Sequence, residues 1–490
     1  MKYIFRQTAL LWMIVPIFFS CATYNKSMTG YYNSLREGNY SAAQRSIEHN
    51  KLLQKDRNAL LYNLEMGKLY RLQNDPVKSN IYLNRADGIS ESNRKSLKDV
   101  ALGNILNPMH QAYRGEDFEK FMMHYYKALN YAALGQTEDA VVEARRITLS
   151  ENAQGDKFND KKNHYNQDAF GLNLQGMIYE MAGNMNDAFI SYRNAANLYL
   201  KNKKEYYGVS MPPQLAEDLL RTSNAMDFTG ERSQYEKIFN TNYTETPSAG
   251  GELILFLEEG AAPVKTEKNF ILTSGSKGIG SFYYTDDYGN NADFDFDYNA
   301  FNIGEDKLTS LKTYRLALPD YKVQYATRQN INVTVNGSSY IPQLGQNINS
   351  VAINILKERF VSEMANAFAR QLTKKLAEKG TQALTESVAK STEKKEKETA
   401  DEAEKERQKK KKEERAVHAG EVAGFLMNIV NTATEKADTR NWQSLPAFVS
   451  YVRIPLNAGE NEVTVFANGK PITIKAQGRT GLQMMSVILP

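Results

Sequence analysis

Small, aromatic and glycine positions recur in the same order in two stretches of the chain between Phe121 and Leu200. In each stretch a small residue precedes a tyrosine by three positions, a glycine follows the tyrosine by four, and an alanine follows that glycine by five. Small residues let two helices approach closely, the glycine ends the first helix, and aromatic rings fill the remaining space. The pattern predicts two helical hairpins, with packing positions Ala128, Tyr131, Gly135 and Ala140 in the first and Gly176, Tyr179, Gly183 and Ala188 in the second.

Weaker versions of this pattern precede the two copies, in Thr29 to Ile47 and in Leu60 to Ala86. Their offsets are close to the period of roughly 34 residues that is typical of tetratricopeptide repeats. The chain resembles that repeat class, because two copies keep the same internal offsets. The resemblance implies a helical repeat domain over residues 29–240, with the polar stretch Ser150 to Asn166 as a loop between repeats.

After Gly251 the pattern changes from helical to extended. Short apolar or alternating runs predict strands, and Asn468-Gly469 predicts a tight hairpin turn. The predicted strands are Glu252–Glu258, Thr313–Leu318, Tyr321–Tyr325, Ile331–Val335, Phe448–Leu456, Glu462–Phe466, Ile472–Lys475 and Met485–Leu489.

A helical segment interrupts these strands. Apolar residues recur at every fourth position from Leu356 to Leu376, which predicts one long helix that packs through a single stripe. Residues 391–415 are almost wholly charged or polar and predict a solvated spacer. We therefore expect an α+β fold: an N-terminal all-α tetratricopeptide-like solenoid, then a mainly antiparallel β domain (241–490) with an inserted helical arm (350–436).

The first residues have the pattern of a secretory signal. Lys2 and Arg6 precede an apolar run from Ala9 to Phe19, which is shorter than the about 20 residues of a membrane span. Phe18-Phe19-Ser20-Cys21 resembles the lipobox of bacterial lipoproteins, which implies a signal peptide over 1–20, lipid attachment at Cys21 and a tether over 21–28. Because no acidic retention or export signal follows Cys21, we expect an outer-membrane anchor with the body facing the periplasm. An ordinary signal peptide with an incidental cysteine is the alternative.

Two segments in the second half resemble an uncharacterised bacterial lipoprotein family with tetratricopeptide-like N-terminal repeats and a C-terminal β-rich domain. One is Gly251 to Lys265, with its Gly-Glu strand followed by Ala-Pro-Val-Lys, and the other is Ala437 to Pro446. The family has no established activity, so the resemblance supports the architecture and not a reaction. In the second segment, Asp438, Arg440 and Trp442 are predicted to form a structural charge pair and an aromatic plug that lock the last helix to the next strand.

Composition and motifs give no reason to expect an enzyme, a metal or a cofactor. The formal charge of +4 argues against nucleic acid, and 5 His with 1 Cys argue against a zinc site. Asp293, Asp295 and Asp297 alternate with phenylalanine, but a calcium loop would need glycine where Tyr298 stands. A strand edge with its carboxylates in solvent is the favoured interpretation.

The sequence therefore predicts a scaffold that binds a protein partner of unknown identity, in an envelope or cell-wall assembly. Stacked helix pairs form a concave surface lined by the first helix of each pair. Five residues on first helices are candidates for this protein-binding groove: Tyr125, Tyr126, Asn130, Asn173 and Gln175. The alternative is a module that binds glycan or peptidoglycan through tyrosines or through the aromatic stretch Phe282 to Phe301.

Overall fold

The computed structural model describes residues 24–95, 108–155, 168–245, 249–274, 281–286, 290–297, 299, 313–393 and 436–489. The predicted signal peptide, Cys21 and almost all of the charged spacer lie outside the described residues. The predicted tether is partly wrong, because residues 24–28 begin the first described helix and Tyr24 and Met28 are buried.

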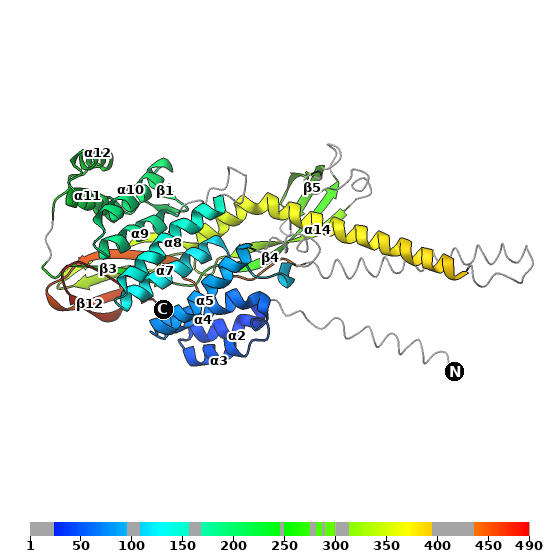
Figure 1. Ribbon diagram of the computed structural model, residues 1–490, viewed down its shortest axis with the longest axis horizontal. Coiled ribbons are helices and arrows are strands. Elements are labelled where there is room, and N and C mark those ends of the chain that lie inside the picture. Colours follow the sequence, from blue (N-terminus) through cyan, green and yellow to red (C-terminus); the bar gives the residue numbers. More distant parts are fainter. Residues whose placement is uncertain are drawn as a thin grey trace, which may run out of the picture.

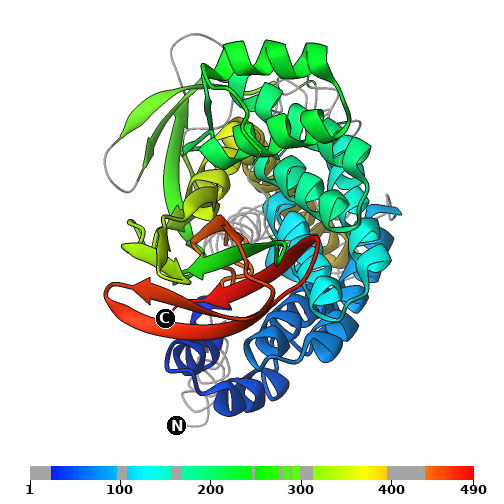
Figure 2. The same ribbon diagram turned by 90° about the vertical axis from the view of Figure 1, so that its left-hand side faces the viewer.

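The N-terminal half consists of helices that pair consecutively into antiparallel hairpins (Figure 1). The pairs are α2 (Tyr24–Arg36) with α3 (Tyr40–Glu48), α4 (Ala59–Leu72) with α5 (Pro76–Lys95), α7 (Asp117–Ala133) with α8 (Thr137–Gly155), α9 (Ala169–Met181) with α10 (Met185–Lys201), and α11 (Pro213–Ala225) with α12 (Thr229–Phe239). Short 3-10 turns lie at Asp56–Asn58 and Pro108–His110, and a small ribbon joins β1 (Glu205–Tyr206) to β2 (Val209–Ser210). Successive pairs stack into an arc, which confirms the predicted tetratricopeptide-like solenoid (Figure 2).

The turn inside each hairpin has one geometry. A residue with positive φ ends every first helix, namely Gly38, Asn74, Gly135, Gly183 and Asp227. The next N–H then donates to a carbonyl five residues back, as in Gln136 to Tyr131 and Asn184 to Tyr179. This is the Schellman cap, whose left-handed residue favours glycine, asparagine or aspartate. The predicted turn glycines Gly135 and Gly183 are confirmed.

The small residues of the repeats allow the close helix packing that the sequence predicted. Ala128, Ala140 and Ala188 are buried. A Cβ added to Gly176 would lie 2.6 Å from the ring of Tyr192 on α10, so only glycine admits the ring there. Of the two repeat tyrosines, Tyr179 is buried and Tyr131 is half-buried.

The strands form three four-stranded sheets. Their bounds are β3 (Glu252–Glu259), β4 (Val264–Ser274), β5 (Ser281–Asp286), β6 (Asn291–Asp295), β7 (Thr313–Lys322), β8 (Ile331–Val335), β9 (Ser338–Tyr340), β10 (Gln343–Asn347), β11 (Phe448–Pro455), β12 (Gly459–Ala467), β13 (Lys470–Gly478) and β14 (Leu482–Ile488). The sheet orders are β10-β11-β3-β14, β13-β12-β8-β9 and β6-β5-β4-β7. Pairing is antiparallel except between β14 and β3, which are parallel, so the mainly antiparallel prediction is confirmed.

Each sheet has its own packing partner. The sheet containing β3 lies between the helices on one face and the sheet containing β12 on the other. The third sheet packs on α14 (Ile348–Glu393), where Met364 and Phe368 contact a cluster that includes Phe270 and Phe282. This confirms the predicted stripe as far as the side chains of that helix are described.

The helices and the first sheet share one hydrophobic core. A single buried cluster runs from Tyr24 through the repeat helices to Phe256 on β3 and to Trp442 and Tyr451 near the end of the chain. In Figure 2 the helices curve around the strands, which occupy the concave side of the arc. The predicted boundary near residue 241 therefore separates helices from strands, but it does not separate two cores. In the described part of the chain, no helix is long and apolar enough to span a membrane.

Gly176→Ala and Gly88→Ala form a matched test of the close helix approach. We expect Gly176→Ala to lower the free energy of unfolding by about 1–3 kcal/mol, because the new methyl group displaces the Tyr192 ring. A Cβ on the exposed Gly88 meets nothing within 4 Å, so Gly88→Ala should be neutral or stabilising by up to about 1 kcal/mol. Urea unfolding followed by circular dichroism measures both variants, and equal effects would contradict the packing described here.

Candidate functional site

The concave face of the helical array is filled by the protein's own strands. All five predicted groove residues are buried: Tyr125, Tyr126, Asn130, Asn173 and Gln175 are 0%, 0%, 0%, 1% and 8% exposed. Gln175 lies between helices of the array and donates to the Ala144 carbonyl of α8 at 3.2 Å. Tyr125 packs on Phe256 of β3, and Asn173 donates to the hydroxyl of Tyr451 on β11 at 3.0 Å. The expectation that these side chains face solvent is therefore wrong. The surface that a solenoid usually offers to a partner is covered here by the chain itself.

A buried charge cluster joins the second and third hairpins to β3. The carboxylate of Glu258 accepts from Lys68 Nζ at 2.6 Å and from the Tyr126 hydroxyl at 2.9 Å. Burial alone would raise the pKa of Glu258, but attraction to Lys68 and Arg71 outweighs it and lowers that pKa. Glu258 is thus held ionised inside the molecule by cations of α4.

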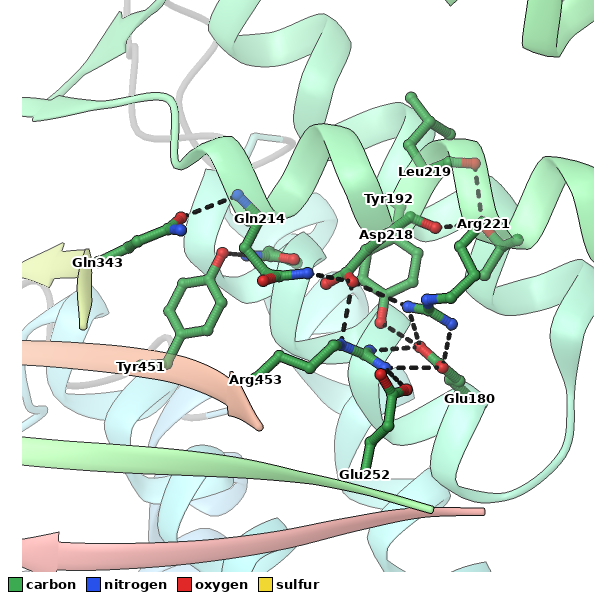
Figure 3. Close-up of polar contacts among 12 residues, drawn as sticks. Glu180, Tyr192, Gln214, Asp218, Leu219, Arg221, Glu252, Gln343, Tyr451 and Arg453 are labelled. Atoms are coloured by element: carbon green, nitrogen blue, oxygen red, sulfur yellow. Dashed lines mark hydrogen bonds and ion pairs between the residues drawn. The ribbon is translucent and has the colours of Figure 1, made fainter. Parts of the chain in front are cut away.

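A second cluster joins the later hairpins to β11 (Figure 3). The guanidinium of Arg453 contacts Glu180 of α9 at 2.8 Å, Asp218 of α11 at 3.0 Å and Glu252 of β3 at 2.6 Å. Arg221 of α11 binds the same Glu180. Burial would raise the pKa of Glu180, but Arg453 and Arg221 overcome it and lower the pKa to about 2.

The glycine of the second repeat takes part in this cluster indirectly. The Tyr192 ring that fills the space above Gly176 places its hydroxyl 2.8 Å from the Glu180 carboxylate, as Figure 3 shows for Tyr192 and Glu180. Gly176, which the sequence predicted as a packing position, therefore also allows Tyr192 to orient the Glu180 carboxylate that binds Arg453 of the sheet.

The segment predicted to be structural is buried and charge-paired, but its partners differ from the prediction. Arg440 pairs with Asp438 at 2.6 Å, and it also donates to Asn58 and to the carbonyls of Gln111 and Pro108. Trp442 is 0% exposed and packs edge-on against Tyr126. The charge pair and the plug are thus confirmed. They fasten the segment that precedes β11 to the turns at Asn58 and Pro108 and to Tyr126 of α7. The last helix that they were predicted to lock, Glu421 to Val430, lies outside the described residues.

Two glutamates beside Trp442 have strongly raised pKa values. Burial raises the pKa of Glu65 to about 7, although it accepts hydrogen bonds from Ser444 and Tyr32. Burial, reinforced by repulsion from Glu116, raises the pKa of Glu119 to about 7, although it accepts from the Trp442 backbone N–H. In the part of the chain that the structure describes, neither carboxylate forms an ion pair of the kind that Lys68 forms with Glu258.

Among the described residues, one group of buried side chains has the composition of a metal site. Asp87, His124 and Glu143 each offer an atom within 4.8 Å of the others. However, Lys127 Nζ lies 2.7 Å from Asp87 and 2.9 Å from Glu143, so an ammonium group already balances the carboxylates. The contacts are those of an ion-pair network between α5, α7 and α8, and we assign no metal to them.

The alternating aspartates lie where the sequence placed them. Asp293 and Asp295 are exposed on β6, which is an edge strand, and Phe294 and Phe296 are buried. The outward carboxylates are in position to hinder pairing with another chain.

An open groove of about 870 Å³ lies beside the filled concave face. On one side are the hairpin turns after α4 and α7 and the end of α9, with Asn74, Gly135 and Met181 among the lining residues. On the other side are Gly481 and the adjoining strand β14, from Leu482 to Ser486 together with Ile488. Asn130, which was predicted to line the binding groove, is a buried residue in the lining of this open groove.

Sequence reasoning missed this groove because it depends on the position of β14. Only the second half of β14 was predicted as a strand, and parallel pairing with β3, more than two hundred residues earlier, leaves no local signal. The available signal was the uncharged run from Leu482 to Ile488 at the end of a domain rich in charged strands.

Comparisons with known proteins add little. No family model and no curated protein matches the chain. Among solved structures, MamA is 13% identical over 42% of this chain and 90% of its own, with a TM-score of 0.26. Aspartyl phosphate phosphatase F from Bacillus subtilis is 16% identical over 44% and 49%, with a TM-score of 0.30. A tetratricopeptide repeat protein from Parabacteroides merdae is 14% identical over 46% and 81%, with a TM-score of 0.22. Likenesses this remote carry no argument about function.

The raised pKa values of Glu65 and Glu119 predict a dependence of stability on pH. A carboxyl whose folded pKa is raised stabilises the fold fully below its ordinary pKa of about 4.5, and this contribution is lost as pH rises to about 7. The free energy of unfolding should therefore fall between pH 5 and 7. The fall should be smaller in a Glu65→Gln, Glu119→Gln double variant. Each glutamate that is removed should reduce the slope of the free energy of unfolding against pH by up to about 1.4 kcal/mol per pH unit.

Urea unfolding at pH 5, 6, 7 and 8 measures this difference in slope. Glu37→Gln, at an exposed position, is the control and should follow the wild type. A double variant with the slope of the wild type would show that these two glutamates titrate normally.

Proposed function

We propose that this protein is a non-enzymatic scaffold that binds another protein through the groove along β14. The observation that carries the proposal is the division of the concave side into two parts. The strands fill one part, and the other stays open where three successive hairpins and one strand meet. The buried charge clusters are ion pairs that join helices to strands, so they support a structural role and not a catalytic one.

The glycan or peptidoglycan alternative has less support. It required tyrosines in an open groove or an exposed aromatic stretch after Phe282. Tyr125 and Tyr126 are buried, and Phe282, Phe294 and Phe296 pack in the core formed with α14. Tyr283 is exposed, and Phe301 lies outside the described residues. Tyr40 is the one aromatic residue among the described residues that line the open groove, whereas sugar rings are commonly held between several aromatic faces.

Site-specific photo-crosslinking tests protein binding at the groove. A photoreactive residue at Ala133, which is exposed and lines the groove, should give adducts with an envelope protein. The same residue at Val142, exposed at 46% on α8 and outside the groove lining, is the matched control and should not. Equal adducts at both positions, or sedimentation of the protein with purified cell wall in place of adducts, would contradict the proposal.

The proposed location is the outer membrane, with the body in the periplasm as part of an envelope or cell-wall assembly. The support is the sequence alone: a basic start, a short apolar run and Cys21 in a lipobox-like context. Acyl chains contribute about 0.8 kcal/mol per buried methylene, so a multiply acylated cysteine holds a folded body at a bilayer.

Cys21→Ser should abolish incorporation of labelled fatty acid and move the protein from the membrane fraction to the soluble periplasmic fraction. Fractionation of cells that express the wild type and the variant measures both effects. If the wild type takes up no label and the variant still sediments with membranes, the lipid anchor is wrong.

A further inference from the structure

Strand β14 presents an unpaired backbone edge to the groove. The carbonyl of Gly481 accepts from Glu252, and the N–H of Leu489 donates to Glu258, so odd-numbered residues pair with β3. Backbone groups alternate sides along a strand, and the even-numbered residues therefore point away from β3. Among the described residues, none bonds to the backbone of Leu482, Met484, Ser486 or Ile488 on that side.

The side chains agree with this alternation. Leu482 and Met484 belong to the core shared with the helices, and Ser486 accepts from Arg71 of α4 at 2.5 Å. Met485 and Val487 face the other sheet. The strand is thus fixed by its side chains on both faces and by β3 on one edge. At roughly 3.3 Å per residue, its seven residues offer roughly 23 Å of free edge.

The other sheet edges of the described chain carry features that block strand addition. Edge strand β6 has exposed aspartates, β7 contains Pro319 and Asp320, and β13 has Lys470, Pro471 and Lys475. Strand β9 is three residues long, and β10 is five residues long with Gln343 bonded to the start of α11. Charge, proline and short length are the usual protections of an edge. Strand β14 has no charged residue, no proline and full length.

The groove is cationic. Among the described residues, its lining contains Arg71 and Arg479 and has no aspartate or glutamate. Each hairpin turn brings the end of one helix and the start of the next to the groove, so their dipoles offset each other. Arg71 lies 4.0 Å from the buried Glu258 carboxylate, which offsets its charge, so the positive charge of the groove comes mainly from Arg479, which is exposed beside the start of β14. The Nε2 amide of Gln483, another lining residue, is buried and has no acceptor among the residues that the structure describes.

Resting on the proposed function, we propose that the groove binds an extended segment of the partner protein, which adds to the sheet as a strand along β14 and carries a carboxylate toward Arg479. Main-chain hydrogen bonds supply affinity in this mode of recognition, and side-chain pockets and charges supply selectivity. Extension of the sheet would satisfy the outward backbone groups of Leu482, Met484 and Ser486. The even spacing of those groups selects an extended segment over a helix.

The probe for this mode is a synthetic seven-residue peptide of alternating valine and threonine with glutamate near one end, labelled with a fluorophore. Two peptides of the same length are controls: one with an N-methyl group on every backbone amide, which leaves neither edge able to pair, and one with lysine in place of glutamate. We expect the unmethylated acidic peptide to bind at least about tenfold more tightly than either control, because each control removes hydrogen bonds or charge attraction.

Ser486→Pro and Ser486→Ala are the matched protein variants. Both remove the hydroxyl that accepts from Arg71, but only proline removes the outward N–H. Proline is tolerated on an edge strand where the N–H faces out. Ser486→Pro should weaken peptide binding about tenfold, Ser486→Ala should leave it within about twofold, and Arg479→Glu should reverse the preference between the acidic and basic peptides.

The outcomes separate this inference from the proposed function. Failure of the acidic peptide to bind, or binding that is insensitive to N-methylation of the peptide, would overturn strand addition. Adducts at Ala133 would still support a protein partner in either case. The methylated peptide is tested on the wild-type protein, so this test of strand addition does not depend on whether Ser486→Pro folds. A concentration-dependent dimer that Ser486→Pro abolishes would assign the edge to a second copy of this chain and also overturn the inference.

Discussion

Buried charges that are neutralised across the contact between helices and strands are the constraint on which this structure depends. Arg453 on β11 faces Glu180 and Asp218 from the helices, Lys68 on α4 faces Glu258 on β3, and Lys265 on β4 faces Glu116 at the start of α7. Leaving a buried charge without its partner costs about 3–5 kcal/mol. Each ion pair can therefore form in only one position of the strands relative to the helices. Together the pairs fix how the sheet that contains β3 lies against the helical array.

This constraint explains why a solenoid of tetratricopeptide-like hairpins does not offer its concave face to a partner. Tyrosines that would line an open groove instead donate to carboxylates of the sheet, as Tyr126 does to Glu258. The same contacts place β14 against the ends of α7 and α9, and so create the open groove at the rim of the filled face. The binding surface that we propose is thus a consequence of the internal packing.

Features of the fold that are specified by nearby residues could be predicted from the sequence. Positive φ at Gly135 and Gly183, the space for Tyr192 at Gly176, and the turn at Asn468-Gly469, where both residues have positive φ, each follow from residues a few positions apart. The pairing of distant faces could not be predicted. Nothing near Glu180 shows that its charge is met by Arg453, 273 residues later, and nothing near Tyr125 shows that Phe256 covers it. The groove was missed for the same reason, since it is bounded by segments that meet only in the folded chain.

The central claim is that the helical array and the strands form one cooperative unit, and Trp442 allows a direct test. In a chain that begins after residue 21, Trp442 is the one tryptophan, because the other is Trp12. It is fully buried at the contact between the two halves, whereas circular dichroism at 222 nm reports mainly the helices. Equilibrium unfolding in urea should give coincident transitions by tryptophan fluorescence and by circular dichroism. A fluorescence transition at clearly lower urea, with the helical signal still intact, would show that the array folds without the strands and would contradict this account.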